Sequence, residues 1–110
     1  MTDAYRIEWS PSAVEDLIQI FEYIASNDHP SSAECFCSNI LGRTHTLANY
    51  PRRCRIVPEL KAVGVRQYRE LIVPPYRILF RIDKDVVGIV GVLDGRRDLE
   101  ELLIKRALEN

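Results

Sequence analysis

The chain has 110 residues, of which 46% are hydrophobic and 28% are charged, and these are ordinary values for a globular protein. This length predicts one domain, residues 1–110, with a single hydrophobic core. No apolar run approaches the ~18 residues of a membrane-spanning helix and no signal peptide opens the chain, so we expect a cytoplasmic protein without membrane contact.

Charge is unevenly distributed along the chain, although the formal net charge is only −1. Residues 1–50 contain two basic and seven acidic residues, a balance of −5, whereas residues 51–110 contain thirteen basic and nine acidic residues, a balance of +4. This division favours contact between the second half and an anionic partner, but ion pairs between the two halves would explain it equally well.

The cysteines do not form a recognisable framework. They are three in number, and Cys35 and Cys37 are two positions apart within a predicted helix, where they point to different sides. Neither a disulfide framework nor a metal-binding set fits this pattern, so we expect reduced thiols, no metal and no cofactor.

The first half of the chain predicts a short strand followed by a helical hairpin. Residues 5–9 alternate in polarity and are β-prone. A helix then begins at Ser10-Pro11 and ends near Asn27-Asp28, and a second helix begins at Pro30 and is ended by Pro51. The apolar residues at helical spacing are Ala13, Val14, Leu17, Ile20, Phe21, Ile24, Ala33, Phe36, Cys37, Ile40, Leu41 and Leu47.

The second half predicts a loop over residues 52–64, three strands joined by short turns, and a final helix from Asp98. The strands should form an antiparallel meander. In the middle strand, alternation places Tyr76, Ile78, Phe80 and Ile82 on one face and Arg77, Leu79, Arg81 and Asp83 on the other. The order β-α-α-β-β-β-α predicts an α+β fold, with an antiparallel sheet packed against a helical hairpin.

An ordered set of short motifs runs through these elements. Its members are Ala13, Asp16-Leu17, Ile20, Tyr23-Ile24, Leu47, Pro51, Tyr68-Arg69-Glu70-Leu71, Tyr76-Arg77-Ile78, Arg81 and Gly95-Arg96-Arg97-Asp98. In this order and at these spacings, nearly the whole chain resembles the RelE/ParE superfamily of type II toxins. The fold that this resemblance implies agrees with the element order that hydrophobic periodicity predicts.

The resemblance implies a toxin that is neutralised by a cognate antitoxin and could form a heterotetramer with it. RelE-like members cleave mRNA on the ribosome, whereas ParE-like members inhibit DNA gyrase and so block replication. The Gly-Arg-Arg-Asp ending and the mildly acidic chain are more similar to the ParE branch, although Asp94 stands where that branch often has a histidine. A non-toxic remnant that only binds antitoxin is a further alternative.

A RelE-like ribonuclease would need a base, an acid and cations that stabilise the charge on the phosphorane. The arginines that could supply the cations are Arg69, Arg77, Arg81, Arg96 and Arg97. No base is evident, because arginine has a pKa above ~12 and is a poor proton-transfer group. His29 and His45 lie in the helical half, where we expect structural or solvent-facing roles. Whether the chain is an enzyme therefore depends on the branch.

Each arginine also has a structural alternative. Arg77 and Arg81 could pair with acidic neighbours such as Glu70 or Asp83 across adjacent strands. Arg96 and Arg97 could instead bond to helix or strand carbonyls and fix the final turn. We expect Arg77 to be structural in a ParE-like chain and functional in a RelE-like one.

Antitoxin binding is the second predicted site. Surplus apolar residues on the helices, Phe21 and Phe36 in particular, would receive an antitoxin helix. The full predicted set is Phe21, Phe36, Tyr68, Tyr76 and Arg77, although both tyrosines are also common strand residues that could pack in the core. The sequence thus predicts a basic sheet surface, framed by helices, that engages another macromolecule.

Overall fold

The computed structural model describes residues 4–109, and its main elements follow the predicted order. They are β1 (Arg6–Trp9), α1 (Pro11–Asn27), α2 (Pro30–His45), β2 (Tyr68–Val73), β3 (Tyr76–Asp83), β4 (Val86–Asp94) and α4 (Glu100–Glu109). The second helix ends at His45, so the prediction that it continues to Pro51 is wrong: a 3₁₀ turn, Thr46–Ala48, follows it, and a second 3₁₀ turn is Pro51–Arg53. The segment predicted as a loop, residues 52–64, contains a short helix α3 (Pro58–Lys61).

The four strands form one sheet in the order β1-β4-β3-β2. The predicted antiparallel meander of β2, β3 and β4 is confirmed, and so is the α+β class. The sheet as a whole is mixed, because β1 pairs with β4 in parallel. No hairpin turn joins these two strands, so nothing local requires them to be antiparallel.

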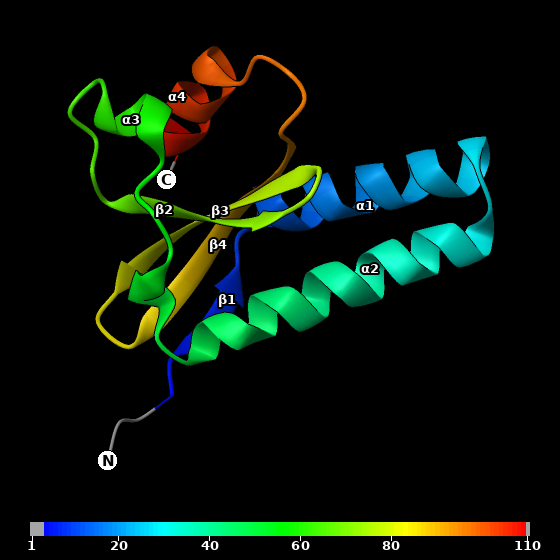
Figure 1. The fold of residues 1–110 in the computed structure, drawn as a ribbon, viewed down its shortest axis with the longest axis horizontal. Helices are drawn as coiled ribbons and strands as arrows, with labels where there is room; N and C mark the ends of the chain where they lie inside the picture. Colours follow the sequence, from blue (N-terminus) through cyan, green and yellow to red (C-terminus); the bar gives the residue numbers. More distant parts are fainter. Residues whose placement is uncertain (1–3, 110) are drawn as a thin grey trace.

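Helices cover both faces of the sheet (Figure 1). On one face α1 and α2 lie side by side as a long hairpin that projects beyond the sheet, and on the other face α3 packs against α4. Strand alternation explains the two layers. Ile78 and Phe80 of β3 belong to the core beneath the hairpin, whereas Leu79 belongs to a second core beneath α4.

The ends of the hairpin helices are fixed by their flanking residues. Ser10 caps α1 by accepting a hydrogen bond from the Ala13 N–H at 3.1 Å, and Pro11 occupies the first turn. His29 caps α2, because its Nδ1 accepts from the Ser31 N–H at 3.3 Å. This cap gives His29 the structural role that the sequence predicts for it.

Two residues predicted in the helix cores are largely exposed. The exposed fractions are 41% for Val14 and 45% for Leu41. Each follows a fully buried residue, Ala13 or Ile40, and so lies at the edge of its apolar stripe, turned toward solvent. Within residues 4–109, no helix is both long and apolar enough to cross a bilayer.

Candidate functional site

Arg77 of β3 is enclosed by two carboxylates. Its Nη1 and Nη2 each donate to Glu59 at 2.7 Å, and its Nε donates to Glu70 Oε1 at 2.7 Å. Glu70 is only 2% exposed, and its other oxygen accepts from Arg55 Nε at 2.5 Å. We call Arg55, Glu59, Glu70 and Arg77 the Arg77 network; its four formal charges cancel.

Each member of the Arg77 network stabilises the ionised form of its neighbour. The hydrogen bonds from Arg77 hold the pKa of Glu59 below its usual range, and bonding to Glu59 and then Glu70 raises the pKa of Arg77. Every nitrogen of the Arg77 guanidinium already bonds to a carboxylate, and the side chain is 13% exposed. A phosphate could reach Arg77 only by displacing these carboxylates.

Among the other predicted cations, Arg69 and Arg96 are also held by partners of their own, and Arg97 is exposed beside Arg96. Arg69 Nη1 donates to the carbonyls of Cys54 at 2.6 Å and Arg52 at 3.3 Å, and Arg81 is partly buried at the far end of β3. Arg96 forms a two-point ion pair with Asp94, at 3.0 and 2.7 Å. The cationic sheet surface expected from the sequence is therefore replaced at its centre by a neutral network.

The turn after β4 is fixed by Asp94. Its Oδ1 also accepts from the Arg96 N–H at 3.0 Å, and these bonds lower the pKa of Asp94 to about 2. Gly95 donates its N–H to the Pro75 carbonyl at 2.7 Å, and a Cβ at this position would lie 2.9 Å from that oxygen. The Gly-Arg-Arg-Asp motif thus owes its glycine to close packing and its first arginine to the preceding aspartate.

The predicted antitoxin-binding residues are divided between the core and the surface. Tyr68 is 1% exposed beneath α4, where its hydroxyl donates to the Ala107 carbonyl at 3.1 Å, so it is not available to a partner in this structure. Phe36 and Tyr76 meet edge to face with ring centroids 5.0 Å apart, and burial raises the Tyr76 pKa. Phe21 is partly exposed on α1.

The structure also exposes aliphatic residues that the sequence interpretation did not assign to a partner. Ile18 is 44% exposed and lies one turn after Val14 on α1, while Leu41 is exposed on α2. The i, i+4 spacing of Val14 and Ile18 was the available signal, because it marks a second apolar stripe beside the buried one.

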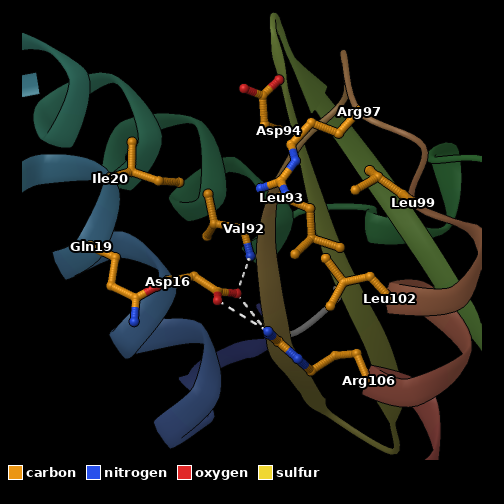
Figure 2. A pocket seen from close by; sticks show the side chains of 10 residues that line it. All are labelled: Asp16, Gln19, Ile20, Val92, Leu93, Asp94, Arg97, Leu99, Leu102 and Arg106. Atoms are coloured by element: carbon orange, nitrogen blue, oxygen red, sulfur yellow. Dashed lines mark hydrogen bonds and ion pairs between the residues drawn. The ribbon is translucent and has the colours of Figure 1, made fainter. Parts of the chain in front are cut away.

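A groove of about 270 Å³ lies between α1, β4 and α4. Figure 2 shows Asp16 and Arg106 meeting at its base, where Arg106 donates to the two Asp16 oxygens at 2.6 and 3.0 Å. Asp16 Oδ2 also accepts from the Val92 N–H at 2.9 Å, and Arg106 Nη1 donates to the Val90 carbonyl at 2.8 Å. Because β1 ends beside Ile89, these side chains bond to β4 where its neighbouring strand has ended.

Other chemistry finds little support in the described part of the chain. Among residues 4–109, no three His, Cys, Asp or Glu side chains gather closely enough to hold a metal ion. Cys35, Cys37 and Cys54 are free thiols, and burial raises the pKa of Cys54. His29 is used as a helix cap, far in sequence from the arginine strands.

Comparison with known proteins gives one consistent result. The profile of a family described as "ParE toxin of type II toxin-antitoxin system, parDE" matches residues 7–99. Toxin ParE3 of Caulobacter vibrioides is 30% identical over 91 residues, which cover 83% of this chain and 87% of that toxin.

Two solved structures share the fold. A chain of the chromosomal ParDE toxin–antitoxin system from P. aeruginosa has a TM-score of 0.69 at 17% identity, covering 84% of this chain and 98% of that one. A chain of the toxin–antitoxin complex RelBE2 from Mycobacterium tuberculosis has a TM-score of 0.57 at 18% identity, covering 86% and 94%. With the family profile matching most of its length, the chain belongs to the ParE family of type II toxins.

Proposed function

We propose that this toxin acts by binding DNA gyrase and blocking replication in the cytoplasm, and that a cognate antitoxin neutralises it. The Arg77 network is the observation that carries the choice of gyrase over mRNA. A ribonuclease needs an uncommitted cation beside the scissile phosphate, and the central-strand arginine here is bonded to two carboxylates. Inhibition by binding needs no such group.

A supercoiling assay with purified gyrase and the purified toxin tests this proposal. We expect the toxin to inhibit supercoiling and to leave ribosome-bound mRNA intact in a translation extract. In cells, expression of the chain alone should produce a DNA-damage response and filamentation. Cleaved transcripts with rapid loss of protein synthesis, and normal supercoiling, would assign the chain to the RelE-like alternative.

The Glu59→Gln variant sharpens the distinction between the two activities. Glu59 is partly exposed on α3, and its neutralisation would leave Arg77 paired only with Glu70. If Arg77 could bind phosphate and were blocked only by Glu59, this variant would gain nuclease activity. We expect no such gain and unchanged inhibition of gyrase, provided that thermal unfolding shows the variant to be folded.

We propose that an apolar helix of the antitoxin docks on the exposed outer side of the α1–α2 hairpin. Val14, Ile18 and Leu41 are 41–45% exposed there, and an amphipathic helix could cover them. Ile18→Lys should weaken antitoxin binding about tenfold or more while leaving inhibition of gyrase intact. Gln19→Lys, with the same added charge on a different side of α1, is the control. Equal antitoxin affinities for the two variants would mean that the antitoxin binds elsewhere.

We also propose that the toxin and its antitoxin form a heterotetramer. The molecular mass of the purified complex in solution tests this stoichiometry.

A further inference from the structure

Five arginines gather where α2 ends and the chain turns toward β2. We call this set, which comprises Arg43, Arg52, Arg53, Arg55 and Arg69, the arginine turn. In Figure 1 the segment lies at the opposite end of α2 from the tip of the helical hairpin. The arginine turn is thus separated from the hairpin tip by the whole length of that helix.

Hydrogen bonds connect four members of the arginine turn, and Arg55 follows Arg53 along the chain. Arg53 donates to the Asn49 carbonyl at 2.9 Å and to Thr46 Oγ1 at 2.9 Å, and Thr46 in turn donates to the Arg43 carbonyl at 2.6 Å. Arg69 reaches across from β2 to the Cys54 and Arg52 carbonyls. The arginines therefore belong to one continuous surface segment and not to scattered sites.

Most of the positive charge in the arginine turn is not balanced by carboxylates. The chain contains no aspartate or glutamate between Glu34 and Glu59. Arg43 and Arg52 are exposed and their side chains bond to no residue that the structure describes. In the same described region Arg53 and Arg69 bond only to uncharged oxygens, so Arg55 alone has a carboxylate partner.

A purely structural role explains only part of this surface. Arg53 and Arg69 fix the turn through carbonyl groups, and cations near the end of α2 suit its dipole. The dipole accounts for Arg43, which lies in the last turn of α2, but neither explanation accounts for Arg52. Burial raises the pKa of the Cys54 thiol, and the positive charges of Arg53, Arg69 and Arg43 oppose that rise. The guanidinium groups of these three arginines therefore lie close enough to Cys54 for their positive charges to influence the same thiol.

We propose that the arginine turn binds the phosphate backbone of duplex DNA. Guanidinium groups bind phosphate at two points, and Arg53 and Arg69 are already held in place, so they lose little freedom on binding. An acidic protein partner fits less well, because protein interfaces centre on apolar anchors. Here the one large hydrophobic side chain that is exposed between Leu41 and Val63, among those described, is Tyr50. The choice of DNA over RNA rests on the proposed function, since DNA is the polymer on which gyrase acts.

Fluorescence anisotropy with a labelled duplex of about 20 bp, and with no gyrase present, tests the proposal. Arg43→Glu/Arg52→Glu reverses two charges whose side chains hold no contact in the described structure. Lys61→Glu/Arg66→Glu is the matched control, with the same change of net charge on exposed side chains near α3. Titrations between about 50 and 200 mM salt give the number of phosphates contacted.

We expect the wild-type toxin to bind DNA with a steep salt dependence. The Arg43/Arg52 variant should bind at least about tenfold more weakly at low salt, and its salt slope should fall by about 2, whereas the control should stay within about twofold. If charge reversal disturbs the fold in circular dichroism, Arg43→Gln/Arg52→Gln should lower the slope by the same amount.

Three results would overturn the proposal: no binding at low salt, equal weakening by both double variants, or displacement of DNA by polyglutamate at equal charge. Tighter binding of single-stranded RNA than of duplex DNA would overturn the choice of DNA. Inhibition of gyrase by the wild-type toxin is measured in a separate assay. If the toxin binds DNA but does not inhibit gyrase, only the proposed function is contradicted. If the toxin inhibits gyrase but does not bind DNA, only the proposed role of the arginine turn is contradicted.

Discussion

Glu70 holds a charge in an almost fully buried position, with its side chain 1% exposed between Arg55 and Arg77. A buried ion pair contributes little net stability when complete, but loss of one partner leaves the other charge buried and unpaired. The sequence interpretation named Glu70 as one possible partner of Arg77, and the structure confirms that pairing. It could not identify Glu59, because α3 lies in a segment that lacks helical periodicity.

Glu70→Gln should therefore destabilise the toxin by about 3 kcal/mol, since Arg77 would keep only its more exposed partner. Glu59→Gln is the matched comparison. Its side chain is 31% exposed, so its loss should cost only about 1 kcal/mol. Urea unfolding of both variants measures the difference. Equal losses, or a larger loss for Glu59→Gln, would show that burial does not control the Arg77 network.

Acid should weaken the fold through the carboxyl groups of Asp94 and Glu59, whose pKa values are lowered in the folded toxin. A lowered folded pKa gives stability that is present above the unfolded pKa and is lost as pH falls through the folded value. For Asp94 this window runs from about 3.8 down to about 2.

Asp94→Asn should accordingly reduce the fall in Tm over that pH window while changing Tm little between variants at the acid end. The effect at neutral pH should be below about 1 kcal/mol, because water screens the Asp94–Arg96 pair. Calorimetry at stepped pH values measures it. An unchanged acid slope in the variant would contradict the role given to Asp94.

At the scale of elements, two side chains bond to the backbone of β4 beyond the point where β1 ends. β1 pairs with β4 only as far as Ile89, and Asp16 of α1 and Arg106 of α4 then bond to Val92 and Val90. One pair of side chains thus satisfies backbone groups that would otherwise need a longer β1, and it joins two helices from different layers. The sequence analysis names Asp16 only as part of the motif set and predicts no bond between it and Arg106.

Asp16→Ala should destabilise the toxin by about 2–4 kcal/mol, because it removes the carboxylate that accepts from Arg106 at two oxygens and from the Val92 N–H. Hydrogen exchange should quicken at Val92 and throughout α4 before it quickens in β3. Glu15→Ala, which removes an exposed neighbour bonded only to Gln19 in the described structure, is the control. Uniformly faster exchange in all elements would argue against a local role.

The α2 helix can be stabilised at Gly42. A Cβ there would meet no atom within 4 Å, and the residue lies inside the helix with no need for a positive φ. Gly42→Ala should therefore raise stability by about 0.5–1 kcal/mol, since alanine loses less backbone entropy on folding. Gly91→Ala provides the contrast. Its Cβ would lie 3.1 Å from Arg106 Nη1, so it should lower stability. A destabilised Gly42→Ala variant in urea unfolding would contradict this account.

For the whole molecule, periodicity in the sequence predicted the sheet and the helical hairpin that covers one of its faces, but not the packing of α3 and α4 on the other face. Alternation in β3 correctly separated Phe80 from Leu79, and the hairpin helices followed from their apolar spacing. The parallel pairing of β1, the Arg77–Glu59 pair and the Asp16–Arg106 pair all join residues from elements that are not adjacent along the chain. Such contacts depend on how the layers close, so no local pattern predicts them.

Removal of residues 99–110 should collapse one of the two cores. Leu99 and Leu103 cover Tyr68 and Leu79 on the face opposite the hairpin. The shortened chain should lose cooperative unfolding and bind a hydrophobic dye, because that face would be open to water. Leu108→Ala, at a side chain that is 83% exposed, should have little effect on either measurement. Cooperative unfolding of the shortened chain would contradict this division into two cores.

The Asp16–Arg106 pair joins positions 90 residues apart along the chain. During synthesis α1 leaves the ribosome long before α4, so Asp16 has no bond to Arg106 until α4 has also been made. A newly made toxin therefore passes through a period in which its hairpin has been synthesised but α4 is not yet bonded to α1.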